Sequence, residues 1–224
     1  MQIKGIIFDL DGTLLDSMPI WETLGGDYLV QKGIVPEIGI NEKFKTLTTY
    51  DAAKYYKTHY GLKESVKTIL EEINKHVEYQ YLHVFLLKKS VHEFLKKMVS
   101  NKIKLCVATA SERYIVEAAL KRNGVFKYFD SILTCTEVGY AKTEPAIFNE
   151  ALKQLGTKKT ETLIFEDALH AIQTAKLAGF TVVGIEDKSA ESEKNKIQKL
   201  TDYYIKSNES WSEWYDKNFN NCGF

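Results

Sequence analysis

The stretch Ile6-Ile7-Phe8-Asp9-Leu10-Asp11-Gly12-Thr13-Leu14 decides how this chain folds. Its apolar beginning predicts a short buried strand, and two acids one residue apart follow that strand directly. Side chains alternate along a strand, so Asp9 and Asp11 share one side of it, and Gly12 then permits a sharp turn. Two carboxylates held this close favour a hard cation with oxygen ligands, usually Mg²⁺ where phosphate is the substrate. The alternative interpretation is a polar turn after a strand.

A helical region separates this strand from the rest of the chain. Between Asp16 and about Leu86 the residue pattern favours helices and contains no convincing strand. The expected helices cover Pro19–Lys32, Thr49–His59 and Glu64–His83. We therefore expect a helical insertion between the first strand and all later ones.

From Lys88 onward, helices and strands alternate. The four expected strands cover Lys104–Ala108, Ser131–Leu133, Thr162–Phe165 and Phe180–Ile185. Alternation of this kind is typical of a parallel sheet that is covered by helices on both faces. The predicted fold class is therefore α/β, with a core domain of residues 1–15 and 87–224 and an all-helical domain of residues 16–86 inserted into it.

The C-terminal segment is expected to complete the core. Its pattern predicts a helix at Ala190–Leu200 and a short edge strand at Tyr203–Ile205. Three aromatic residues then recur at helical spacing, and we expect them to pack on the core rather than bind a ligand; they are Trp211, Trp214 and Tyr215. Residues 220–224 are expected to form a loose tail.

Composition narrows the classes of function. The 224 residues include 30 Lys and Arg and 30 Asp and Glu, so the formal charge is zero and gives no reason to expect nucleic acid or a membrane as partner. The three cysteines form no CxxC pair, and Cys106 is expected to be a small buried hydrophobe. The chain contains no apolar run near the ~20 residues of a membrane span and no signal-peptide pattern, so we expect a soluble cytoplasmic protein.

Ligands of open parallel sheets bind at the carboxyl ends of the strands, so the residues that follow each strand matter most. One strand ends in Thr109-Ala110-Ser111, where a hydroxyl and free N–H groups can hold a phosphate oxygen; a simple helix cap is the alternative. Another ends in Glu166-Asp167, which are either helix caps or further oxygen ligands for a metal. Lys142 lies in a loop before a helix and, taken alone, is typical of a surface charge.

Taken in chain order, these segments resemble the four motifs of the haloacid dehalogenase-like hydrolases, a superfamily made up mainly of Mg²⁺-dependent phosphatases. Asp9-Leu10-Asp11-Gly12-Thr13-Leu14 resembles the first motif, Thr109 the second, and Glu166-Asp167 the fourth. Lys142 falls in the third motif, often written KPxPxxF, although Thr143 stands where proline is usual. The resemblance covers residues 1–15 and 88–187 and implies a Rossmann-like core, usually monomeric.

The resemblance also implies a role for each of these residues. Asp9 attacks phosphorus and forms an aspartyl-phosphate, while Asp11 acts as general acid and then as general base. The implied phosphate-binding residues are Gly12, Thr109, Ala110 and Lys142. Mg²⁺ is expected on a carboxylate oxygen of Asp9, the main-chain carbonyl of Asp11 and Asp167, with Glu166 bound directly or through water.

The reaction class and the substrate depend on Asp11 and on the insertion. Asp11 favours phosphate esters over haloacids, because a halide leaving group needs no acid and the dehalogenases of this superfamily lack that aspartate. Residues 16–86 look like the helical cap of the β-phosphoglucomutase-like branch, which can close over the site and set specificity.

Two departures from the mutase bear on the choice of reaction. Trp21 stands where β-phosphoglucomutase has a histidine, and residues 34–60 contain no arginine. We therefore expect a phosphatase acting on a small phosphorylated metabolite, with Trp21 as a candidate substrate contact. The alternatives are a sugar phosphate mutase, a phosphonatase, and a non-catalytic protein that binds a phosphorylated metabolite.

Overall fold

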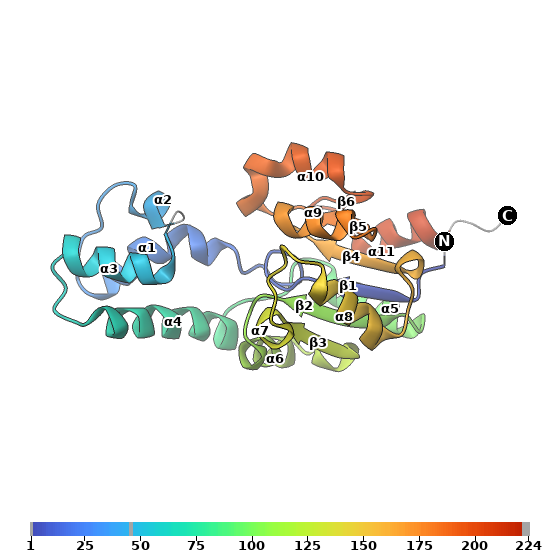
Figure 1. Ribbon diagram of the computed structural model, residues 1–224, viewed down its shortest axis with the longest axis horizontal. Coiled ribbons are helices and arrows are strands. Elements are labelled where there is room, and N and C mark those ends of the chain that lie inside the picture. The colour runs from blue at the N-terminus through green and yellow to red at the C-terminus, as the bar shows by residue number, and fades with distance from the viewer. Residues whose placement is uncertain (1, 45–46, 221–224) are drawn as a thin grey trace. The chain divides into compact units, whose positions relative to one another are not determined.

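The computed structural model describes residues 2–44 and 47–220, so Cys222 and most of the expected tail lie outside the described residues. The chain divides into two compact units (Figure 1). Residues 1–16 and 85–224 form the core unit, and residues 17–84 form the helical unit.

A six-stranded sheet forms the centre of the core unit, in the order β3-β2-β1-β4-β5-β6, with every neighbouring pair parallel. The strands are β1 (Gly5–Phe8), β2 (Lys104–Thr109), β3 (Ser131–Thr134), β4 (Thr162–Glu166), β5 (Thr181–Ile185) and β6 (Tyr203–Ile205). In the middle, Phe8 of β1 lies opposite Val107 of β2 and Phe165 of β4. The predicted α/β fold with a parallel sheet is confirmed, including its short edge strand.

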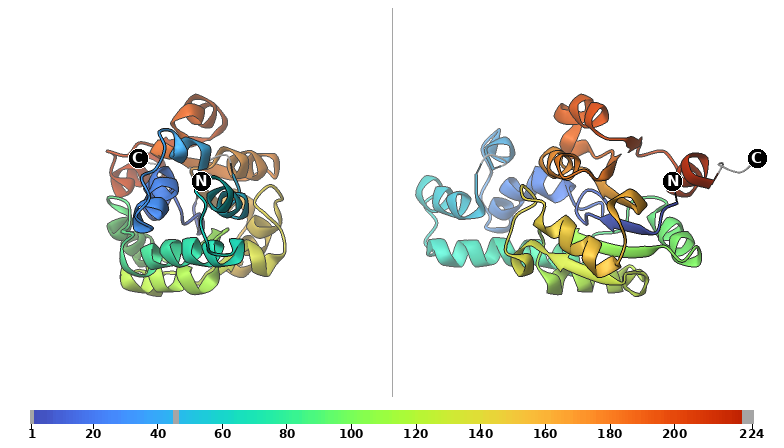
Figure 2. Two further views of the ribbon diagram at one scale, coloured as in Figure 1. Left: turned by 90° about the vertical axis from the view of Figure 1, so that its left-hand side faces the viewer. Right: turned by 45° about the vertical axis from the view of Figure 1, so that its right-hand side comes forward.

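Helices cover both faces of this sheet (Figure 2). On one face lie α8 (Ala146–Leu155), α9 (Leu169–Leu177) and α10 (Lys194–Leu200). The other face carries α5 (Val91–Ser100), α6 (Arg113–Arg122) and α11 (Trp211–Tyr215). Strands buried on both faces must be apolar on both sides, which explains the apolar residues 6–8 of β1 and 163–165 of β4.

An aromatic cluster packs against the central strands on the second of these faces. The ring centroid of Phe8 lies 5.0 Å from that of Phe165 and 6.5 Å from that of Trp211, and Phe94 lies 5.5 Å from Trp211. Trp211 and Tyr215 are buried, as predicted for this segment. The C-terminal helix therefore belongs to the core.

The sequence pattern did not reveal two short helices, α2 (Ile40–Phe44) and α7 (Cys135–Val138). Helices of one turn are too short to display a periodic apolar face. α7 nevertheless begins with a capping box, in which the Thr134 hydroxyl accepts from the Glu137 N–H and the Glu137 side chain accepts from the Thr134 N–H. The spacing Thr-x-x-Glu is a sequence signal for such a start.

The helical unit consists of α1 (Pro19–Gln31), α2, α3 (Thr49–His59) and α4 (Val66–His83). Tyr56 lies at its centre, with its ring 5.2 Å from that of Tyr28 and 5.7 Å from that of Phe44. A Cβ added to Gly25 would lie 2.9 Å from the Cβ of Phe44, so glycine permits the close packing of α1 on α2. The buried Tyr56 hydroxyl donates to the Gly25 carbonyl over 2.6 Å.

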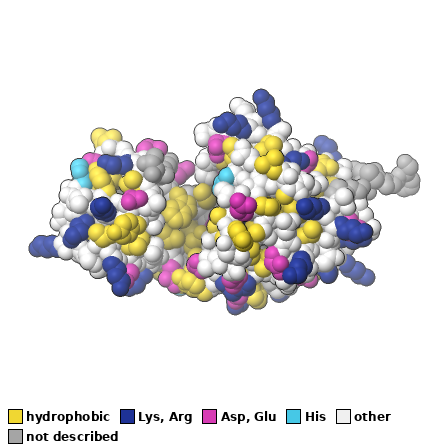
Figure 3. Space-filling model, in the orientation of Figure 1, with side chains coloured by type: hydrophobic (Ala, Val, Ile, Leu, Met, Phe, Trp, Pro, Cys, Tyr) yellow, Lys and Arg dark blue, Asp and Glu magenta, His cyan; other side chains and the backbone are white. Residues whose placement is uncertain are grey.

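The surface of the helical unit includes several large hydrophobic side chains, visible in Figure 3 as yellow areas. They include Val35 and Ile38, which lie in the loop between α1 and α2, and Tyr50, which lies in α3. Lys, Arg, Asp and Glu side chains are interspersed on the face that Figure 3 shows. None of the described helices combines the length and the apolar character that crossing a membrane would need.

Tyr56→Phe tests the hydrogen bond at the centre of the helical unit. We expect the free energy of unfolding to fall by about 1–2 kcal/mol, because the buried hydrogen bond from the Tyr56 hydroxyl to the Gly25 carbonyl is lost. Urea unfolding followed by circular dichroism measures the change. Tyr50→Phe is the matched control, because Tyr50 is 57% exposed and its hydroxyl can bond to water; equal losses in the two variants would contradict this role of Tyr56.

Candidate active site

The sheet order brings the singled-out residues to one edge of the core unit. β2, β1 and β4 are neighbours and parallel, so their carboxyl ends lie side by side. Asp9 follows β1 and its N–H donates to the Phe165 carbonyl over 2.9 Å, while Thr109 and Glu166 are the last residues of β2 and β4. Lys142 reaches this edge from the loop between α7 and α8.

The loop after β1 is a tight turn held by its own backbone. The N–H groups of Leu14 and Leu15 donate to the Leu10 carbonyl over 2.9 and 2.8 Å, and the Gly12 N–H donates to the Leu15 carbonyl over 3.1 Å. Gly12 adopts a φ of +78°, which glycine tolerates best. In this structure the Gly12 N–H is therefore engaged inside the turn.

Three buried carboxylates meet at this edge. One oxygen each from Asp9, Glu166 and Asp167 lies within 4.8 Å of the others, and each residue is less than a tenth exposed. The Lys142 ammonium, also buried, donates to Asp9 and to Glu166 Oε2, the latter over 2.8 Å. Thr13 donates its hydroxyl proton to Asp167 Oδ1 over 2.7 Å.

Burial and mutual repulsion set the pKa values of this group. Loss of solvent raises the pKa of Asp9 well above its usual range; the negative charge of Glu166 raises it further, and Lys142 opposes this. Burial and Glu166 likewise raise the pKa of Asp167 to about 8. Burial alone would lower the pKa of Lys142, but the carboxylates of Asp9 and Glu166 raise it above its ordinary value.

The donor set suits a hard divalent cation. Three acids share a small volume with one ammonium group, so full ionisation of the acids would leave a net negative charge that a cation can neutralise. Carboxylate oxygens are the ligands that Mg²⁺ and Ca²⁺ prefer. Both Glu166 oxygens already accept protein hydrogen bonds, from Lys142 and from the Ala168 N–H over 3.2 Å.

Asp11 lies outside this group of three. The Ser111 hydroxyl donates to Asp11 Oδ2 over 2.7 Å, and the Ser111 N–H donates to the Thr109 hydroxyl oxygen over 3.0 Å. Ser111 is therefore not the cap of α6, whose N-cap is Glu112, and it links the ends of β1 and β2 instead. Asp11 is half-buried and the neighbouring Ala110 is exposed.

Two residues at the site, Thr13 and Ser111, have contacts that the sequence pattern did not predict. Thr13 belongs to the first motif, but its spacing from Asp9 gave no indication of its bond to Asp167. For Ser111 a helix cap was the alternative interpretation, and nothing in the sequence indicated its bond to Asp11. Trp21, the candidate substrate contact, lies in α1 of the helical unit and is half-buried, so its part in binding stays a prediction.

Comparison with known proteins identifies the family. A sequence profile described as haloacid dehalogenase-like hydrolase matches residues 6–185. The chain therefore belongs to the haloacid dehalogenase-like hydrolases, as its four motifs suggested.

Curated relatives and solved structures agree with this assignment. The chain is 28% identical over 191 residues to the phosphorylated carbohydrates phosphatase of Thermotoga maritima, covering 79% of this chain and 82% of the relative. It is 28% identical over 190 residues to the fructose-1-phosphate phosphatase of Escherichia coli K12, covering 81% and 95%. A Thermotoga maritima structure provisionally named beta-phosphoglucomutase superposes with a TM-score of 0.82 at 20% identity, covering 96% and 99%, and supports the fold.

Asp167→Asn tests the electrostatic cost of the acidic group in the metal-free protein. The carboxyl of Asp167 has an ordinary pKa of 3.8, raised to about 8 in the fold, so its ionisation costs folding energy that grows as pH rises between these values. In the presence of a chelator, we expect the variant to be more stable than the wild type by about 1–3 kcal/mol near pH 8.5, and by much less near pH 4.

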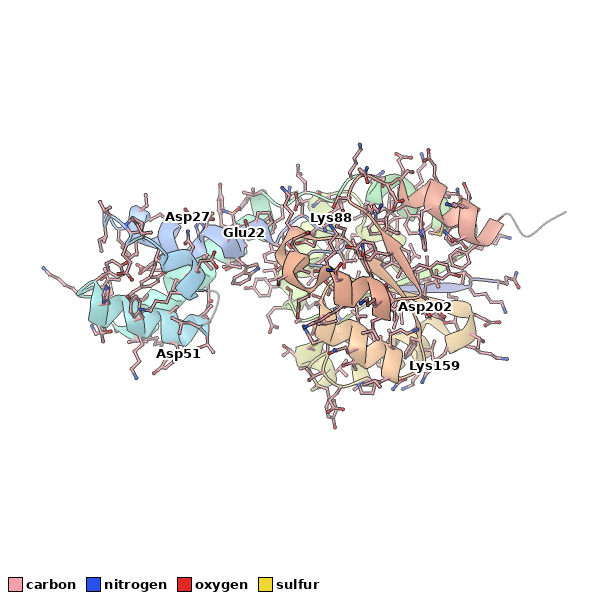
Figure 4. The ribbon with its side chains drawn as sticks, turned by 90° about the horizontal axis from the view of Figure 1, so that it is seen from above. Glu22, Asp27, Asp51, Lys88, Lys159 and Asp202 are labelled. Atoms are coloured by element: carbon pink, nitrogen blue, oxygen red, sulfur yellow. The ribbon has the colours of Figure 1, made fainter. Side chains whose placement is uncertain are left out.

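Thermal unfolding of both proteins across this pH range measures the difference. Asp27→Asn serves as control, because Asp27 is an exposed residue of α1 (labelled in Figure 4) and its replacement should leave the pH dependence unchanged. A variant that is destabilised at high pH would contradict the repulsion among these carboxylates.

Proposed function

We propose that this protein is a Mg²⁺-dependent phosphatase that hydrolyses a small phosphate monoester through an aspartyl-phosphate on Asp9. The observation that supports the proposal most strongly is the buried contact of Asp9 with Lys142, beside Glu166 and Asp167. A nucleophilic carboxylate must be ionised, and the Lys142 ammonium group opposes the rise in the pKa of Asp9 that burial and Glu166 cause. Among the curated relatives, two phosphatases of phosphorylated carbohydrates are 28% identical to this chain, whereas the pyrophosphatases are 22–26% identical, and the higher similarity favours a phosphorylated carbohydrate as the substrate class.

The proposed metal site consists of Asp9, the main-chain carbonyl of Asp11 and Asp167, with Glu166 close by. When bound, Mg²⁺ would neutralise charge on the phosphoryl oxygens. Within the protein, the Thr13 hydroxyl orients Asp167, and the Lys142 ammonium together with the Ala168 N–H restrains Glu166. These hydrogen bonds favour a fixed arrangement of the acids, which a specific metal site needs.

The proposed reaction has two steps. In the first, a carboxylate oxygen of Asp9 forms a bond to phosphorus while the bond from phosphorus to the ester oxygen breaks, and Asp11 gives its proton to the departing alkoxide. In the second, Asp11 takes a proton from a water molecule as that water attacks phosphorus, and the Asp9 carboxylate leaves. The hydrogen bond from Ser111 holds the Asp11 carboxylate in the resting protein.

The phosphoryl group is proposed to bind between the ends of β1 and β2. Lys142 supplies a positive charge, and Thr109 supplies a hydroxyl that accepts from Ser111 and still carries its own proton for donation. Ala110 contributes its backbone N–H ahead of α6, while Gly12 shapes the turn that brings Asp11 near. Together these groups would stabilise the negative charge that spreads over the oxygens in the transition state.

Specificity is proposed to come from the inserted helical domain, residues 16–86, with residues 1–15 and 87–224 supplying the chemistry. Side chains of an inserted cap can select a substrate while the core stays unchanged. Trp21 is the residue that we expect to influence this choice, because it occupies the position of the mutase histidine.

A panel of phosphorylated metabolites tests the proposed function. Phosphate release is measured with Mg²⁺ across sugar phosphates, polyol phosphates, nucleotides and phosphoglycolate, and isomerisation of glucose 1-phosphate to glucose 6-phosphate is followed in parallel. Release from one class without isomerisation is the expected outcome. Isomerisation with little release would favour a mutase, and inactivity in both assays would favour a protein that only binds phosphorylated metabolites.

Asp9→Asn is expected to abolish phosphate release while the protein stays folded. An amide cannot form the acyl phosphate, and Asn keeps the size of the side chain, so turnover should fall by at least about 10⁴-fold. Circular dichroism checks the fold, and mass spectrometry of acid-quenched wild type should find phosphate on the peptide that contains Asp9. Retained turnover in the pure variant would contradict the covalent mechanism.

Asp11→Asn separates the two steps. An aryl phosphate has a good leaving group that needs no protonation, so we expect the variant to release one equivalent of phenol in a burst and then turn over slowly. An alkyl phosphate should show no burst, with its rate reduced by about 10²–10⁴-fold. Rapid-quench kinetics on both substrates distinguishes these outcomes, and equal loss on both esters would contradict the role of Asp11 as the acid of the first step.

A further inference from the structure

A second lysine of the core unit, Lys88, has a side chain that is largely shielded from solvent. Lys142 contacts two of the three carboxylates, Asp9 and Glu166, whereas Asp167 accepts a hydrogen bond from the neutral hydroxyl of Thr13. The side chain of Lys88 is only 14% exposed, and Figure 4 labels it within the core unit. None of the four motifs includes Lys88.

Lys88 connects two loops that are far apart in the sequence. Its N–H donates to the Leu14 carbonyl over 2.9 Å, next to Thr13 in the turn after β1, and the preceding residue Leu87 forms a bridge with Leu15. Its ammonium group donates to the Glu186 carbonyl over 3.0 Å and to Asp187 Oδ2 over 2.7 Å. The residue therefore joins the loop after β1 to the loop after β5.

The loop that carries Asp167 lies between these two. β1, β4 and β5 are neighbours in that order, and Asp167 follows the middle strand. Burial and Glu166 raise the pKa of Asp167 most, and the charges of Lys88 and Asp187 act on it in opposite directions, as expected for neighbouring loops at the same end of the sheet. Asp187 is itself fixed, because its Oδ1 accepts from the N–H of Ser189 over 2.9 Å and from the Ser189 hydroxyl over 2.6 Å.

We propose that Lys88 is a positioning residue of the metal site, which fixes Thr13 and Asp167 by tying the loop after β1 to the loop after β5. The inference rests on the proposed function, because it assigns Lys88 to the Mg²⁺ site of that function. Lys88 touches neither substrate nor metal in this role. Its ion pair with Asp187 is nearly excluded from solvent, so the contact is screened little and resists local motion.

The sign of the effect separates positioning from simple charge. Lys88 is a cation, so its removal by itself would make the site more negative and would strengthen Mg²⁺ binding. If Asp167 is no longer held in place, Mg²⁺ binding should instead become weaker, since disturbing residues that orient metal ligands typically weakens metal affinity by about 10–100-fold. Weaker binding after removal of a positive charge therefore identifies a positioning role.

Isothermal titration calorimetry with MgCl₂ on the purified full-length protein tests this inference. We expect Lys88→Met to weaken Mg²⁺ binding by about tenfold or more. Lys89→Met is the matched control, because it removes the same charge from the adjacent exposed residue, and its affinity should stay within about twofold of the wild type. Lys88→Arg keeps a charged donor and should recover part of the loss.

Kinetics supplies a second readout. The Mg²⁺ concentration for half-maximal activity should rise in Lys88→Met, while kcat at saturating Mg²⁺ stays within about threefold. Lys88→Gln is used if Lys88→Met does not fold, because its amide can still donate to a carbonyl, and the same weakening is expected. Affinity equal to or tighter than wild type in the folded variants overturns the inference.

Failure of the inference and failure of the proposed function give different results. A wild type that binds Mg²⁺ and releases phosphate, with unchanged Lys88 variants, overturns only the role of Lys88. A wild type that shows no Mg²⁺ binding overturns the proposed function and this inference together.

Discussion

Burying three carboxylates at one edge of a sheet is the constraint on which this structure depends. Desolvation and the charge of Glu166 raise the pKa values of Asp9 and Asp167, and the contact of Lys142 with Asp9 offsets part of that cost. A single ammonium group cannot balance three ionised acids, so in the proposed function a bound cation would relieve this electrostatic cost and favour the ionised forms of the acids.

Such a site requires a rigid support, which the aromatic cluster beneath the ends of β1 and β4 provides. Phe8 and Phe165 immediately precede Asp9 and Glu166, and their rings pack 5.0 Å apart against Trp211. Large aromatic side chains in a close-packed core have few alternative positions, and this packing restricts the backbone of the two acids that follow them. The C-terminal helix therefore stabilises the site although none of its residues reaches it.

Much of this arrangement could be predicted from the sequence, because it depends on local pattern. Apolar runs predicted the strands, and acids at the ends of two strands must meet when those strands are neighbours in a parallel sheet. The contacts of Thr13, Ser111 and Lys88 could not be predicted, because each joins segments whose register is set only by packing. Short helices such as α7 could not be predicted from apolar periodicity because they have too few residues, although the capping-box spacing at Thr134 is a sequence signal for a helix start.

The separation of Asp11 from the acidic group has a chemical consequence for the proposed mechanism. A nucleophile benefits from burial beside an ammonium group, because water cannot then compete for its charge. An acid that must load and release a proton in every cycle needs the opposite, namely contact with solvent or substrate. Asp11 is half-buried and bonded to Ser111, outside the group that holds Asp9. One residue of spacing after a buried strand is therefore enough to give two aspartates different environments, and with them different chemical tasks.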